Sequence, residues 1–168
     1  MKSKSKSNKY NRPSFDEVFM TIARIWEKRA TCLRRKVGAV VAIENNTIST
    51  GYNGAPRGTK HCAEIGCLRQ KLKIPSGQRL ELCRAVHAEQ NAILNAARYG
   101  KSVNGATLYV TTSPCSICAK EIINSGIIRI VYDGDYPNPI AMKMLKEARI
   151  KVERYSGTKS QDYFKLFP

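Results

Sequence analysis

Hydrophobic and polar positions along this chain follow the period of a helix in some stretches and that of a strand in others. After position 17, apolar residues recur at helical spacing, at Val18, Ile22, Ile25 and Trp26. Ser14 precedes them with Glu17 three residues on, a capping box, so we predict a helix from there to about Arg29. Two apolar runs at 37–43 and 47–52 flank Glu44-Asn45-Asn46 and predict a β-hairpin.

The rest of the chain predicts a long loop and then an alternation of helices and strands. Residues 53–82 contain repeated glycine and proline and no sustained period, which is typical of a loop. The elements predicted after it are a helix at 87–98, a strand at 106–112, a helix at 114–125, a strand at 127–132, a helix at 139–148 and a strand at 150–155. This order predicts an α/β fold, a three-layer α/β/α sandwich.

Length and terminal composition predict one domain behind a short tail. The chain has 168 residues and no internal repeat, so we expect a single domain at 13–168. Residues 1–12 interleave lysine with serine, a low-complexity pattern that predicts a disordered basic tail. With no apolar stretch long enough to cross a bilayer and no signal-peptide pattern, we expect no membrane partner and a cytoplasmic location.

The net charge of +16 favours an anionic partner, although part of it can be a solvated face. Nucleotides and nucleic acids both fit that charge. The C-terminal region has too few aromatic residues to stack a single strand, namely Tyr155, Tyr163, Phe164 and Phe167. We therefore expect a small-molecule nucleotide and not a polymer. Arg29, Arg57, Lys60 and Arg84 are basic residues near the motifs and are candidates for phosphate contacts.

Two short motifs carry the chemistry. His87 and Glu89 form an H-x-E triplet, and Cys115 and Cys118 follow Pro114 as P-C-x-x-C. Alone, the triplet is usually solvated helix surface, and the cysteine pair can be a redox pair or half of a structural site. Together they match the signature of zinc nucleobase deaminases. One imidazole and two thiolates leave the fourth position of Zn²⁺ for a water, as in a catalytic site.

The elements around these motifs suit that chemistry. Pro114 favours a helix first turn, and the helix dipole and the metal both lower the pKa of the thiols that follow it. Glu89 is then free to take a proton from the water and pass it to the ring nitrogen and the departing amine.

Four segments together resemble the deoxycytidylate (dCMP) deaminase family, namely Val37–Val41, Gly51–Pro56, His87–Ile93 and Pro114–Lys120. The tRNA adenosine deaminases usually have glycine at the position of Lys120. The resemblance implies a mixed five-stranded sheet between helices, a homo-oligomer (dimer or hexamer), and conversion of dCMP to dUMP and ammonia. Action on dCTP or CMP, or on tRNA or single strands, remains an alternative.

The resemblance also implies substrate contacts. Asn53 matches the asparagine that positions the sugar, although Asn-Gly alone favours a turn. The carbonyl of Ser113 is expected to accept from the exocyclic amine, and the amide of Ala88 to face the ring carbonyl. Tyr132 is a candidate to stack on the base, although an aromatic residue at a strand end is more often part of a core.

The other four cysteines, Cys32, Cys62, Cys67 and Cys83, are soft ligands sufficient for one closed tetrahedral zinc site, with His61 as a possible substitute. The family resemblance places Cys32 and Cys62 at such a second, structural zinc. A long loop with little apolar content needs such a link. The alternative is that some of them are ordinary buried cysteines.

Regulation is also implied by the resemblance. Several dCMP deaminases are activated by dCTP and inhibited by dTTP, at a site partly built from the Gly-Tyr-Asn-Gly segment and the helix that follows the active-site Glu. Gly54 and Arg98 are the candidates here, although Arg98 at a helix end can simply complement the helix dipole.

Overall fold

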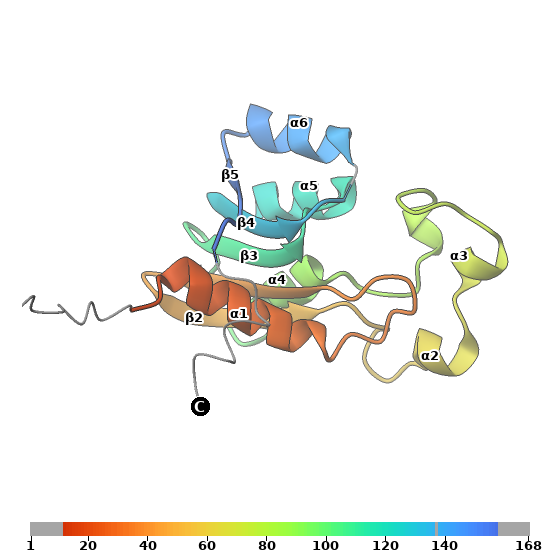
Figure 1. The fold of residues 1–168 in the computed structure, drawn as a ribbon. Coiled ribbons are helices and arrows are strands. Elements are labelled where there is room, and N and C mark those ends of the chain that lie inside the picture. The colour runs from red at the N-terminus through yellow and green to blue at the C-terminus, as the bar shows by residue number, and fades with distance from the viewer. Residues whose placement is uncertain (1–11, 137, 158–168) are drawn as a thin grey trace, which may run out of the picture.

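The computed structural model describes residues 12–136 and 138–157, so the predicted tail lies outside the described residues except for Arg12. A mixed sheet of five strands in the order β2-β1-β3-β4-β5 forms the centre of the fold (Figure 1). The strands are β1 Gly38–Ile43, β2 Asn46–Tyr52, β3 Thr107–Thr112, β4 Arg129–Gly134 and β5 Lys151–Arg154. The predicted fold class and each predicted strand are confirmed.

Strand directions follow from the connections. β1 pairs antiparallel with β2 across a two-residue turn, in which Glu44 and Asn45 have φ of 46° and 65°. Positive φ at both positions gives the turn a twist that matches the twist of the strands. β3, β4 and β5 run parallel, so each of their connections needs a crossover, and helices supply both.

Four longer helices cover the sheet, namely α1 Phe15–Glu27, α4 Ala88–Arg98, α5 Ser116–Asn124 and α6 Pro139–Glu147. Alternate residues of β1 face opposite layers: Val40 packs with Met20 of α1, while Val41 packs in the cluster that holds Ala92 of α4. β1 is therefore buried on both faces, which explains its unbroken apolar sequence. The three-layer arrangement is the one predicted (Figure 1).

The α4 helix lies very close to β2. A Cβ atom added at Gly51 would lie 2.2 Å from the carbonyl oxygen of Ala88 and 2.5 Å from the amide nitrogen of Ala92. Only glycine fits at this position without a shift of backbone. Gly51 therefore sets the position of the helix that begins beside His87.

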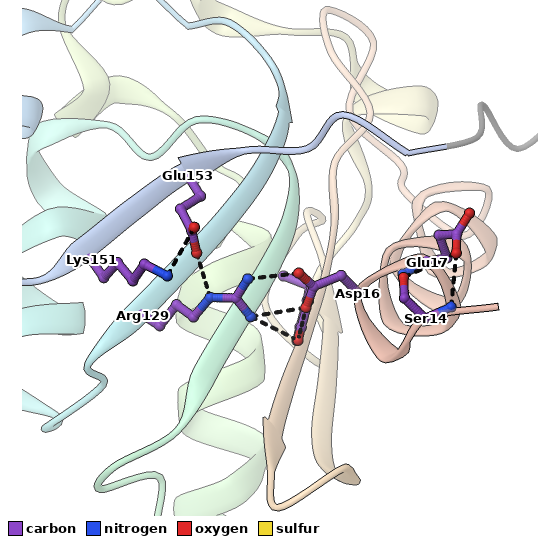
Figure 2. A network of polar contacts seen from close by, with 7 residues as sticks. Ser14, Asp16, Glu17, Arg129, Lys151 and Glu153 are labelled. Carbon is purple, nitrogen blue, oxygen red and sulfur yellow. Dashed lines mark hydrogen bonds and ion pairs between the residues drawn. The ribbon is translucent and has the colours of Figure 1, made fainter.

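The start of α1 is fixed by its cap and by an ion-pair network. Ser14 and Glu17 form the predicted capping box, with the Ser14 amide donating to Glu17 Oε2 at 2.8 Å. Next to it, Arg129 of β4 donates from both terminal nitrogens to Asp16 and from Nε to Glu153 of β5 (Figure 2). These contacts attach α1 to two neighbouring strands.

The segment predicted as a loop contains three short helices, α2 Cys62–Ile65, α3 Leu68–Lys71 and the 3-10 helix η1 Leu80–Leu82. Elements of three or four residues are too short to show a hydrophobic period, so the sequence pattern did not indicate them. In Figure 1, α2 and α3 lie off one end of the sheet. No helix within the described ranges is long and apolar enough to cross a membrane.

Candidate active site

Two helix starts meet at the carboxyl end of β3. His87 is the N-cap residue of α4, Cys115 is the N-cap residue of α5, and Cys118 lies in the first turn of α5. β3 ends at Thr112, three residues before Cys115. The local sequences explain this arrangement, since Pro114 stops the strand and the alanine-rich segment after His87 favours helix.

The three side chains form a compact donor set. His87 Nδ1 lies 3.3 Å from Cys118 Sγ and 3.4 Å from Cys115 Sγ, and the two sulfurs are 3.7 Å apart. Tetrahedral angles with Zn–S near 2.3 Å and Zn–N near 2.0–2.1 Å require separations of about 3.6 Å for N–S and about 3.8 Å for S–S. The observed separations are close to these values, and the donors are of the soft type that zinc prefers. Within the described ranges, this is the only group of three or more potential ligands whose atoms lie within 4.8 Å of one another.

The pKa values of the three donor side chains depend on one another. The neighbouring Cys118 thiol and the His87 ring lower the pKa of Cys115 to about 4. The hydrogen bond to Cys115, together with burial, raises the pKa of Cys118 well above its usual value. Burial lowers the pKa of His87, but hydrogen bonds to Cys115 and Cys83 outweigh it and raise this pKa to about 11. These pKa shifts favour a protonated His87 ring beside a Cys115 thiolate. A divalent cation bound by the same side chains would take the place of that proton as the positive charge.

Glu89 stands beside the donor set and outside it. Its side chain is buried, with the residue 5% exposed, and it lines the same cavity as His87 and Cys115. Burial raises the pKa of Glu89 to about 7, while the positive charge of His87 acts in the opposite direction. A carboxyl group with this pKa can both accept and donate a proton near neutral pH.

Three of the four residues expected to contact substrate, Asn53, Ala88 and Ser113, line this cavity with Glu89. The amide oxygen of Asn53 accepts from the Val37 backbone at 2.8 Å, and its nitrogen donates to the Arg35 carbonyl at 2.8 Å. Asn53 therefore holds the segment before β1 against the cavity. Gly54 forms a β-bridge with Val86, so the Asn-Gly pair is not in a turn.

Comparison with known proteins agrees with this geometry. The model of the cytidine and deoxycytidylate deaminase zinc-binding region matches residues 13–133. The chain belongs to the cytidine and deoxycytidylate deaminase family. The match spans α1 to β4 and includes the whole donor set and Glu89.

Individual relatives in this family are deoxycytidylate deaminases. The one from Schizosaccharomyces pombe is 39% identical over 145 residues, which are 86% of this chain and 45% of that protein. The one from Mycobacterium phage D29 is 43% identical over 127 residues, 73% of this chain and 96% of that protein. The chain thus spans less than half the length of the yeast relative.

A solved structure shares the fold. The crystal structure of dCMP deaminase from the cyanophage S-TIM5 in complex with dCMP and dUMP superposes with a TM-score of 0.73 and 28% identity. The alignment covers 87% of this chain and 100% of that one.

The aromatic residue in the cavity is not the one that the sequence indicated. Tyr132 lies in β4, half-buried against the main core cluster, and the cavity lining does not include it. Tyr136, four residues later, does line the cavity. The Tyr136 amide donates to Ser113 Oγ at 2.7 Å, so the loop after β4 returns to the site. The sequence carried no signal for this return.

The four remaining cysteines all line the same cavity, although their sulfurs do not form a group within 4.8 Å. They are Cys32, Cys62, Cys67 and Cys83. Burial and the neighbouring cysteines raise the pKa of Cys62, whereas the hydrogen bond from His87 lowers the pKa of Cys83 to about 7. His61 faces Thr31, with Nδ1 at 3.1 Å from its hydroxyl. All six cysteines are free thiols.

The two residues expected at an effector site differ in surroundings. Gly54 is buried beside Thr31, whereas Arg98 is exposed at the end of α4.

Gln90 is a positioning residue that sequence reasoning missed. Its side-chain oxygen accepts from the His87 amide at 2.8 Å, and its nitrogen donates to Glu121 of α5 at 2.8 Å. Gln90 thus ties the starts of the two helices that carry the donor set. The spacing of three residues from His87, as in a capping box, was the available signal.

Four arginines line the cavity, namely Arg34, Arg35, Arg69 and Arg84. Of the basic residues singled out from the sequence, only Arg84 is among them. Arg57 instead contacts Asn95 on the surface.

Proposed function

We propose that this protein is a zinc-dependent dCMP deaminase that converts dCMP and water to dUMP and ammonia. The observation that carries the proposal is the compact donor set of His87, Cys115 and Cys118 with buried Glu89 next to it. The names of the relatives and of the cyanophage complex support dCMP as the substrate.

Three residues would hold the metal and a fourth would move protons. Zinc bound by His87, Cys115 and Cys118 would supply a Lewis acid that makes a water nucleophilic near neutral pH. Glu89 takes a proton from the water while the water oxygen attacks C4 of the pyrimidine. Glu89 then delivers this proton to N3. It then takes the proton of the new C4 hydroxyl and transfers it to the amino group, the C4–N bond breaks, and ammonia leaves as the C4 carbonyl forms.

Substrate orientation falls to residues of the cavity wall. The Ser113 carbonyl accepts from the amino group, the Ala88 amide faces the ring carbonyl, and Asn53 contacts the sugar. Asn53 has remaining hydrogen-bonding capacity for this role, because each of its amide atoms can make a second bond. Tyr136 is better placed than Tyr132 to contact the nucleotide, since it lines the cavity.

Ammonia release from the purified, zinc-loaded protein tests the activity directly. We expect dCMP to be the best substrate among dCMP, CMP, dCTP, deoxycytidine and cytosine-containing single strands. A higher kcat/KM for dCTP or CMP than for dCMP would identify that nucleotide as the substrate instead. Higher specificity for a single strand, or for adenosine in tRNA, would place the protein in another branch of the family.

A second, structural zinc is part of the proposal. Four cysteines from different segments line one cavity. Cys32 lies in the loop after α1, Cys62 begins α2, Cys67 precedes α3 and Cys83 follows η1. Metal binding would draw their sulfurs together and link the long segment to the body of the fold. The charges of Cys67, Cys32 and Cys83 contribute to the raised pKa of Cys62, and this effect requires the four side chains to lie near one another.

Regulation and assembly complete the proposal. We infer a cytoplasmic homo-oligomer, a dimer or a hexamer, that dCTP activates and dTTP inhibits through a site near Gly54 and Arg98. Light scattering in the presence and absence of each nucleotide, with initial rates under the same conditions, tests both.

A further inference from the structure

We propose that Asn91 is a positioning residue, whose side-chain amide fixes the Tyr52–Asn53 peptide against the start of α4. This hydrogen bond sets the place of Asn53, which is proposed to contact the sugar, relative to Glu89, the proposed proton carrier. The inference deepens the proposed function and rests on it, because Asn53 and Glu89 act there on the same substrate.

A hydrogen bond between α4 and the end of β2 is the first observation. Nδ2 of Asn91 donates to the carbonyl oxygen of Tyr52 at 2.8 Å, although 39 residues separate them in the sequence. That carbonyl belongs to the peptide bond whose nitrogen is the amide nitrogen of Asn53. The backbone amide of Asn91 donates to the His87 carbonyl at 2.9 Å, so Asn91 closes the helical turn that contains Glu89. The Asn91 side chain therefore joins this turn to the Tyr52–Asn53 peptide.

The hydrogen bonds of Asn53 itself lead away from α4. Its backbone amide donates to the Val37 carbonyl at 3.1 Å, and its backbone carbonyl accepts from the Thr31 amide at 3.2 Å. Its side chain bonds to the backbone of Val37 and Arg35. These partners all lie in the segment between α1 and β1. They attach Asn53 to that segment, but they do not set its distance from Glu89.

A backbone contact on the other side of Asn53 completes the arrangement. Gly54 and Val86 exchange two backbone hydrogen bonds, of 3.1 and 2.9 Å. Asn53 thus lies between a backbone contact to the residue before His87 and the side-chain contact from Asn91. Because backbone atoms make the Gly54–Val86 contact, the bond from Asn91 is the one of the two that a side-chain substitution removes.

Asn95 provides a matched control one turn further along α4. Its Nδ2 donates to the Thr50 carbonyl at 2.8 Å, and like Asn91 it is half-buried. Asn95→Ala therefore removes the same kind of donor between the same helix and strand, but leaves the Tyr52–Asn53 peptide held. Asn91→Ala and Asn95→Ala also make the same change in helix propensity.

A double-mutant cycle on kcat/KM for dCMP tests the link between Asn91 and Asn53. We expect Asn91→Ala to lower kcat/KM by roughly 10- to 100-fold, because a small misplacement of a positioned group has an effect of this size. Asn95→Ala should stay near the wild-type value. If Asn91 acts through Asn53, the loss from Asn91→Ala should largely disappear in the Asn53→Ala background. Full addition of the two losses, or an equal loss with Asn95→Ala, would overturn the proposal.

Hydrogen exchange tests the inference apart from turnover. Asn53 is only 7% exposed and its amide is hydrogen-bonded, so its exchange reports local opening. The Asn53 amide should exchange roughly 5-fold faster or more in Asn91→Ala, as expected for the loss of one hydrogen bond, and at the wild-type rate in Asn95→Ala. Asn91→Asp keeps the size of the side chain without the donor, and it gives the same comparison if Asn91→Ala does not fold.

The two measurements separate failure of the inference from failure of the proposed function. If the wild-type protein deaminated no substrate but the exchange difference were present, the proposed function would fail and the positioning of Asn53 by Asn91 would stand. If the wild-type protein deaminated dCMP but the Asn53 amide exchanged alike in all variants, the positioning role would fail and the proposed function would stand.

Discussion

Nδ1 of His87 lies 3.3 Å from Sγ of Cys118, although 31 residues separate them in the sequence. The contact exists because α4 and α5 begin side by side at the end of β3 and are tied by the Gln90–Glu121 hydrogen bond. Both ligand-bearing turns belong to helices that pack on the same face of the sheet.

Glu89→Gln should abolish deamination, by at least about 10²-fold in kcat, because the amide cannot shuttle a proton. Zinc content should remain that of the wild-type protein, since Glu89 lies outside the donor set. Ammonia release and elemental analysis on the same preparation provide the measurement. Glu147→Gln, an exposed change on α6, is the control. A fully metallated Glu89→Gln protein with wild-type turnover would rule out the proposed role.

Metal content should separate the two groups of cysteines. We expect two zinc ions per chain in freshly purified protein. Cys115→Ser should cost one zinc and the activity, whereas Cys62→Ser should cost one zinc and lower the melting temperature, because a closed structural site is coupled to folding. Elemental analysis and thermal unfolding measure both. A reproducible value of one zinc per wild-type chain would leave the loop cysteines as ordinary thiols.

The Asp16–Arg129 pair should make stability depend on pH. Its hydrogen bonds with Arg129 lower the pKa of Asp16 below the usual 3.8, so the ionised form is favoured in the folded state. This stabilisation is present above the unfolded pKa and is lost as pH falls through the lower folded pKa.

Asp16→Asn should therefore lower the free energy of unfolding by about 1 kcal/mol at pH 7, a value reduced for partial exposure of the pair. The difference from the wild-type protein should shrink below about pH 4, where the aspartate is protonated in the unfolded chain. Urea unfolding at several pH values measures this. A difference that stayed constant down to pH 2 would show that packing, and not the ion pair, is responsible.

Gly51→Ala should damage both stability and activity. The new methyl group would overlap the backbone of α4 at Ala88 and Ala92, so the helix must shift, at a cost of about 1–3 kcal/mol or more. Because Glu89 lies in the first turn of that helix, its carboxyl group would move relative to the thiols of α5. Thermal unfolding and kcat together measure the effect. If the melting temperature and kcat both kept their wild-type values, the β2 backbone at position 51 would be able to shift and accommodate the methyl group at little cost.

Much of the fold was predictable because its signals are local. The capping box at Ser14, the apolar runs of the hairpin and the helix after His87 each depend on neighbours within a few residues. The short helices α2 and α3 were not predicted, since elements of four residues are too short to show a hydrophobic period.

The sequence by itself determined the donor set, because the number, softness and spacing of its ligands narrow the chemistry to zinc before any distance is known. It also predicts the proton carrier, Glu89, which is separated from His87 by a single residue at a helix start. Only the tertiary structure decided which distant residues share the cavity. It brought Tyr136 instead of Tyr132 to the wall, directed both amide atoms of Asn53 to the backbone near β1, and placed buried Arg69 among the cavity-lining residues. These contacts depend on the path that each loop takes from the end of its strand to the cavity. They also depend on which residues distant in sequence bond to buried polar atoms. Local sequence sets neither of these.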